Sequence, residues 1–147
     1  YVSEGSGEFL IENQNFYIKK DDLIIVNPHI QHTEISLSAS PLSYYTVGVD
    51  GISFSFHDQK EFQIFHCSQK HADLLFYFHS LFQELDEKND GYEEICKHTL
   101  AILISQSAVL SLIFSRFHPS SKQRMRPRQA ISGFHYSDDI NLNSLPA

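Results

Sequence analysis

The stretch GSGEFLIENQNFYIKKDDLIIVNPHIQH, residues 5–32, decides the fold of this chain. In the run Glu8–Glu12, Phe9 and Ile11 fall on one face of an extended strand. An Asn-rich turn and a Lys/Asp-rich turn separate this run from two further apolar runs, FYI and LIIV. Proline cannot donate to a sheet ladder, so Asn27-Pro28 ends the last of them. Strands at such short spacing predict a small barrel or sandwich.

Four further strand signals precede residue 67, and the chain up to that point is therefore mainly β. They are Thr33–Leu37, residues 42–49, Ile52–Phe56 and Phe62–Phe65. Alternation over residues 42–49 predicts Tyr44 and Thr46 on one face and Tyr45 on the other. A register error of one residue would exchange Tyr44 for Tyr45.

The apolar period changes from two to that of a helix at about Lys70. The spacing predicts one amphipathic helix from about Lys70 to Lys88 and a second from about Tyr92 to Phe117. The second helix carries two apolar stripes, of which one comprises Ile95, Ile102, Val109 and Ile113. A helix that is apolar on two faces needs two partners, so we expect this stripe to form a homodimer with a second copy. Burial of both stripes within one chain is the alternative.

The C-terminal residues change in character again. Residues 118–128, HPSSKQRMRPR, are rich in Pro, Ser and Arg, as in a linker. The following YSDDINLNSLPA has the Ser/Asp capping chemistry of a helix start. We expect this helix to open a second domain that the sequence does not complete, and we expect further strands before Tyr1.

Composition indicates an ordinary protein of the cytoplasm. The two cysteines are too few for a disulfide scaffold, and no apolar run of about 18 residues is present, so we expect no membrane contact. The net charge is −7, and only Asp138 and Asp139 of the 18 acidic residues lie beyond residue 115. An acidic body is a poor match for a phosphate backbone, so this part is not expected to bind nucleic acid.

The opening segment resembles the effector-binding cupin half of AraC-type transcriptional regulators. The positions that carry the resemblance are Gly5, Gly7, Asp22, Leu23, Asn27, Pro28 and His32. The end of the chain, YSDDINLNSLPA, is similar to the first helix of that family's helix-turn-helix domain, although Pro146 stands where Ala is usual.

The resemblance implies a cupin-like jelly-roll β-barrel followed by two antiparallel α-helices. The implied division is a barrel over residues 1–67, a dimerising helical pair over 68–117, a linker over 118–128 and the start of a truncated helix-turn-helix domain over 129–147. The implied partners are a small-molecule effector, often a sugar, and DNA through helices that this sequence lacks.

Four polar residues on neighbouring predicted strands are candidates for contacting the effector. They are His32, Glu34, Tyr44 and Thr46. Hydrogen-bonding groups beside aromatic faces suit a sugar-like molecule.

Two other functions stay open. His29, His32 and Glu34 have side chains that suit a divalent metal, as in a metal-dependent cupin enzyme. The H-x-H pair and the later His that such enzymes present are missing here, as are nucleophile-elbow, P-loop and dinucleotide motifs. We therefore expect no catalysis, no metal and no cofactor. The other alternative is a domain that only dimerises, its barrel filled by its own aromatic side chains.

Overall fold

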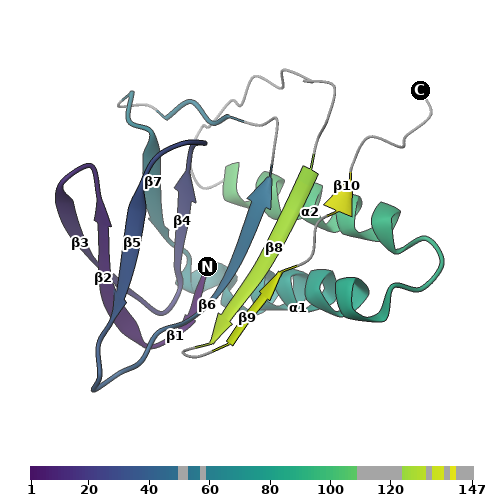
Figure 1. The fold of residues 1–147 in the computed structure, drawn as a ribbon, viewed down its shortest axis with the longest axis horizontal. Coiled ribbons are helices and arrows are strands. Elements are labelled where there is room, and N and C mark those ends of the chain that lie inside the picture. The colour runs from purple at the N-terminus through teal and green to yellow at the C-terminus, as the bar shows by residue number, and fades with distance from the viewer. Residues whose placement is uncertain (50–52, 57–58, 109–123, 132–133, 138–139, 142–147) are drawn as a thin grey trace.

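The computed structural model describes residues 1–49, 53–56, 59–108, 124–131, 134–137 and 140–141. Strands come first, a helical pair follows, and further strands lie after the helices (Figure 1). The elements are β1 Val2–Glu4, β2 Ser6–Ile11, β3 Gln14–Lys19, β4 Asp22–Val26, β5 His32–Ser36, β6 Ser43–Val49, β7 Phe62–His66, the 3-10 helix η1 Ser68–Lys70, α1 His71–Glu87, α2 Tyr92–Ala108, β8 Arg124–Ile131, β9 Phe134–Ser137 and β10 Ile140–Asn141. Val109 and Ile113, expected in the second helix, lie outside the described residues.

The strands form three sheets, all with antiparallel neighbours. β2 is the middle strand of the sheet β3-β2-β5, β4 pairs with β7, and β1 pairs with β6, which continues to β8. The predicted fold class, mainly β with two helices after the cupin-like part, is confirmed. Within the described residues the three sheets do not join into one closed ladder of hydrogen bonds.

The backbone conformation at the β2–β3 turn, and the close packing around Gly7, explain which residues occupy the first hairpin. The β2–β3 turn is formed by Glu12 and Asn13, and both have positive φ (49° and 62°). A two-residue hairpin loop requires such angles, which Asn tolerates well. In β2, a Cβ on Gly7 would lie 2.4 Å from the backbone oxygen of Ile35 and 2.4 Å from Cδ1 of Leu42. Any other residue at position 7 would therefore push β5 or Leu42 away.

The predicted strand over Ile52–Phe56 is wrong for residues 53–56, which are irregular. The side chain of Asn27 takes the place of a strand partner there. Its Oδ1 accepts a hydrogen bond from the N–H of Phe54 (2.7 Å), and its Nδ2 donates to the carbonyl of Phe54 (2.9 Å). One buried amide thus satisfies the backbone of Phe54 without a sheet ladder.

Residues 124–128, expected in a linker, belong to β8 instead. β8 pairs with β6 from Ser43↔Ile131 to Val49↔Met125, which satisfies backbone groups that an unpaired β6 would expose at the sheet edge. Residues 142–147 lie outside the described residues. The assignment of residues 129–147 to a second domain stays a prediction.

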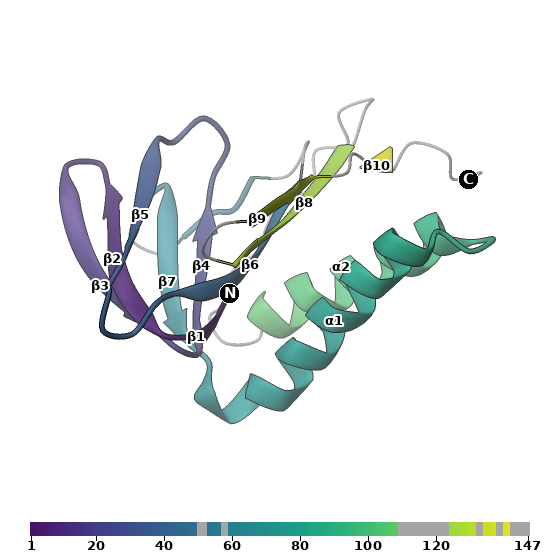
Figure 2. The ribbon, with the colours of Figure 1, turned by 60° about the horizontal axis from the view of Figure 1, so that its bottom comes forward.

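Two apolar clusters lie on opposite sides of the wall formed by β4, β6 and β7. The inter-sheet cluster consists of Val2, Phe9, Ile11, Ile18, Leu42 and Phe62. The helix-side cluster consists of Tyr1, Leu23, Tyr45, Cys67, Leu74, Phe78, Leu81, Phe82, Leu85, Cys96, Leu100 and Leu103. Figure 2 shows both helices on the side of the wall that faces away from β2, β3 and β5.

The apolar run in β4 follows from this arrangement. Leu23 and Ile25 pack with the helix-side cluster, whereas Ile24 and Val26 pack with the inter-sheet cluster. A strand covered on both faces has no polar face to alternate with. All four residues of the run LIIV are therefore apolar, without alternating polar residues.

We predict that Leu81→Ala destabilises the protein by about 2–5 kcal/mol, because it leaves a cavity where a fully buried side chain packs α1 onto its neighbours. Urea unfolding measures this loss. Phe76→Ala on the same helix is the control, since Phe76 is 64% exposed. Its effect should stay within about 0.5 kcal/mol. Equal losses for the two variants would contradict the placement of the helix.

Candidate functional site

Two of the four predicted site residues lie on β5, on the face that points to the inter-sheet cluster. His32 stands opposite Ile11 and Glu34 opposite Phe9 across the β2–β5 ladder. Directly opposite residues project to the same face of a sheet. The His32 ring lies 5.3 Å from the ring of the buried Phe9, and Nε2 of His32 lies 3.8 Å from Oε1 of Glu34.

Tyr44 reaches the same place from β6. It packs against the inter-sheet cluster, whereas Tyr45 is buried against Phe78 on the helix side, with ring centroids 5.3 Å apart. Burial, with the negative charge of Glu34, raises the pKa of Tyr44. At neutral pH the phenol therefore stays protonated and can donate a hydrogen bond.

Thr46 follows two residues after Tyr44, on the same face of β6, and is exposed. The structure brings His32, Glu34 and Tyr44 together, and among the described contacts Thr46 takes no part in this group. We call His32, Glu34, Tyr44 and Thr46 the polar face. Its carboxylate accepts hydrogen bonds, its phenol donates one, and an aromatic ring lies beside them. This set can bind a small molecule that bears hydroxyl groups.

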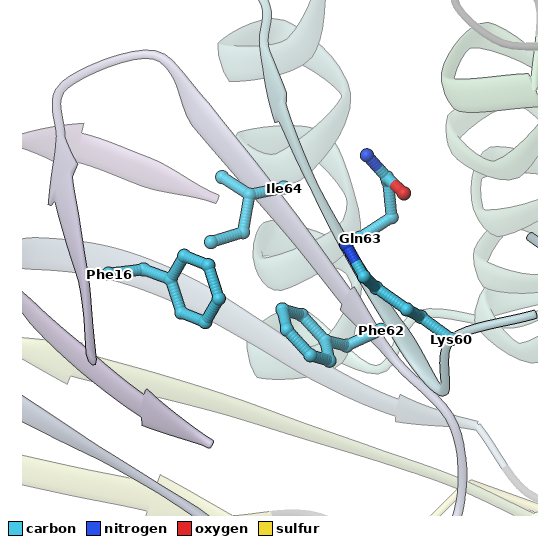
Figure 3. Close-up of a pocket in the computed structure, with 5 residues that line it drawn as sticks. All are labelled: Phe16, Lys60, Phe62, Gln63 and Ile64. Carbon is cyan, nitrogen blue, oxygen red and sulfur yellow. The ribbon is translucent and has the colours of Figure 1, made fainter. Parts of the chain in front are cut away.

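A cavity among the described residues lies elsewhere. It measures about 210 Å³ and is lined by Phe16, Lys60, Phe62, Gln63 and Ile64 (Figure 3). Sequence reasoning did not select any of these residues. Lys60 lies just before β7, and Phe62, Gln63 and Ile64 lie on it. The meeting of β3 with β7 brings Phe16 beside them.

The comparison with family models decides what kind of domain carries these features. Residues 1–104 match the AraC-like ligand binding domain. The chain belongs to this family. The match runs from the N-terminal residue through β7 and α1 into α2, and so covers both apolar clusters. No curated protein and no solved structure matches the chain.

Membership in the AraC-like ligand-binding family gives residues 1–104 a role. They form the N-terminal effector-binding domain of an AraC-type regulator, as the resemblance predicted. In the part of the chain that the structure describes, no three His, Cys, Asp or Glu side chains gather to hold a metal ion. No described helix is long and apolar enough to cross a membrane.

A second polar group in this AraC-like domain ties the turn before β4 to the start of the helices. Asp21 Oδ1 accepts hydrogen bonds from Tyr1 OH (3.0 Å) and from Nδ1 of His71 at the start of α1 (2.5 Å). Asp22 Oδ1 lies 2.8 Å from Nδ1 of His66 at the end of β7. The two histidines thus hold both ends of the β7–α1 connection to one turn.

Sequence reasoning treated this turn only as a polar break. The partners stand 50 residues apart for Asp21 and His71 and 44 apart for Asp22 and His66. No local spacing could have paired them. Burial raises the pKa of Asp21, but the hydrogen bonds from His71 and Tyr1 and the charges of His71 and Lys20 outweigh it. The pKa of Asp21 is therefore lower than its ordinary value.

The lowered pKa of Asp21 predicts an acid-sensitive contribution to stability. A carboxyl whose pKa is lower in the folded state stabilises the protein above its unfolded pKa of about 4, and loses this effect as pH falls through the folded value. Asp21→Asn should therefore destabilise the protein most at pH above about 4, and the difference from wild type should shrink at lower pH. The urea unfolding midpoints of wild type and Asp21→Asn, measured from neutral pH to below pH 4, give this difference in stability. Asp90→Asn, at an exposed turn, is the control. A deficit of Asp21→Asn that grows on acidification would contradict the assignment.

Proposed function

We propose that the polar face is where this AraC-type domain binds its effector, a sugar or another small polyhydroxylated molecule. The observation that carries the proposal is the position of Glu34, 3.8 Å from Nε2 of His32 and on the face of β5 that points to the inter-sheet cluster, against which Tyr44 also packs. A carboxylate flanked by two hydrogen-bonding rings suits vicinal hydroxyl groups. Thr46 adds a hydroxyl on the same face.

Charge and aromatic content support a neutral polyol over an acidic ligand at this face. Glu34 would repel a ligand carboxylate placed beside it. The partly exposed ring of His32, which lies against the buried ring of Phe9, offers a flat face on which the carbon face of a sugar ring can pack.

Isothermal titration calorimetry over a panel of pentoses, hexoses and sugar alcohols tests this proposal. Glu34→Gln should lower the affinity for the tightest-binding ligand by about tenfold or more, because it removes a charged hydrogen-bond acceptor. Glu8→Gln is the matched control, since Glu8 lies on the adjacent strand and alternates to the other face of the sheet. The proposal fails if no member of the panel binds, or if both variants weaken binding equally.

We also propose that α2 forms the dimer interface of the regulator, through the stripe of Ile95, Ile102, Val109 and Ile113. Ile95 is 44% exposed and Ile102 is 38% exposed in the single chain, whereas Cys96, Leu100 and Leu103 of the same helix are buried. Exposed aliphatic side chains one heptad apart suit packing against a second helix. Val109 and Ile113 extend the same stripe in sequence.

Ile102→Glu should convert a dimer into a monomer, because it places a charge in an apolar interface. Light scattering of the purified chain measures the mass. Phe76→Glu is the control: Phe76 is equally apolar and more exposed, but it lies on α1. A dimeric Ile102→Glu variant would overturn the interface.

In the regulator as a whole, effector binding would shift the population between two arrangements of the dimer. The chain that follows α2 would carry this change to the DNA-binding domain of the regulator. Such a regulator acts in the cytoplasm, where its DNA lies. This part of the proposal rests on the family and on the resemblance of YSDDINLNSLPA to a helix-turn-helix start.

A further inference from the structure

The cavity lined by Phe16, Lys60, Phe62, Gln63 and Ile64 lies where two sheets approach each other without pairing. β3 is an edge strand of the sheet β3-β2-β5, and β7 pairs with β4 in a separate sheet. Within the described residues no ladder joins β3 to β7, so side chains alone fill the seam between them. We call this place the β3–β7 seam.

The apolar part of the seam is built from aromatic and branched side chains. Phe16 and Phe62 meet edge to face, with ring centroids 5.3 Å apart and an interplanar angle of 67°. Figure 3 shows Ile64 on the same side of β7 as Phe62, whereas Gln63 extends from the other side. Phe16 and Ile64 are only partly buried, so a ring that enters the cavity can contact both.

The rim of the seam is held in place by a buried amide. Asn27 donates from Nδ2 to Oε2 of Glu61 (2.8 Å), and its backbone N–H donates to the carbonyl of Glu61 (2.8 Å). Glu61 stands between Lys60 and Phe62 in the chain, so the two bonds fix the backbone that carries both lining residues. A rim that is already ordered loses little entropy when a ligand binds.

The seam is separate from the polar face. Phe9 pairs with Phe16 on one side and with Glu34 on the other, so the two places lie two strands apart, about 10 Å. Phe9 itself is only 1% exposed and closes the space between them. A small ligand cannot occupy both places at once.

We propose that the β3–β7 seam is a second binding site, which takes a single aromatic ring that bears a carboxylate. The cavity of about 210 Å³ is open to solvent on one side and has room for such a ring. The ring contacts Phe16, Phe62 and Ile64. Lys60 supplies the only cationic group among the five lining residues and receives the carboxylate. The inference does not depend on the function proposed for the polar face.

Benzoate and benzyl alcohol are the probes that test this site. They share the ring and differ in charge, and each has about nine heavy atoms, so millimolar affinity is expected. Two-dimensional NMR titration of the full chain reports which amides respond. Benzoate should shift the signals of Phe16 and Ile64, and should bind more tightly than benzyl alcohol.

Variants separate the parts of the site. Lys60→Gln, at an exposed position, should weaken benzoate binding about fivefold or more and leave benzyl alcohol binding unchanged, because it removes the charge that receives the carboxylate. Phe16→Ala should weaken both probes. The far-ultraviolet circular dichroism spectrum of Phe16→Ala checks that this variant folds. If it does not fold, the affinities of Lys60→Gln for the two probes test the site. Glu34→Gln is the control and should change neither affinity.

Three results would overturn the proposal. One is the absence of shifts at Phe16 and Ile64 with both probes. Another is an unchanged affinity of Lys60→Gln for benzoate. The last is a loss of benzoate binding in Glu34→Gln as large as that in Phe16→Ala, which would place the probe on the polar face. None of these results bears on sugar binding, so failure here leaves the calorimetric test of the polar face untouched.

Discussion

The wall of β4, β6 and β7 has an apolar cluster packed on each of its faces, and the rest of the domain depends on this constraint. The helices cover one face with a cluster in which Leu81 and Leu85 are fully buried. The sheet β3-β2-β5 covers the other face with a cluster centred on Phe9 and Ile11. Burial of this kind contributes about 25 cal/mol per Å² of apolar surface, so neither layer can leave the wall without a large loss.

The two candidate sites are the two borders of that cluster. At one border β5 and β6 present Glu34 and Tyr44, whose hydrogen-bonding groups stay near solvent. At the other border β3 and β7 present Phe16 and Phe62, which meet without backbone pairing. Phe9 separates them. The cluster thus has a polar border and an apolar border, so the two proposed sites would take ligands of different chemistry.

Sequence alone predicts what depends on local period. The alternation of β5 and β6 placed His32, Glu34 and Tyr44 on one face, and the structure brings these three side chains together. The helical period likewise predicted α1 and α2, because apolar side chains that recur every three or four residues form a stripe along one side of a helix. The AraC-type assignment rested on motif positions and is confirmed by the family match.

What sequence did not predict depends on contacts between distant segments. Asn27 replaces a strand partner for Phe54 through one side chain, so the expected strand there does not form. Asp21 meets His71 across 50 residues. Contacts between distant segments therefore fix the positions of these elements, and local sequence patterns do not reveal them.

The two faces of the wall are connected through adjacent residues of β6. Tyr44 faces the polar face, and Tyr45, the next residue, stacks on Phe78 of α1. Because a strand alternates, a ligand that displaces the backbone at Tyr44 also displaces Tyr45 against the helices, without any longer chain of contacts.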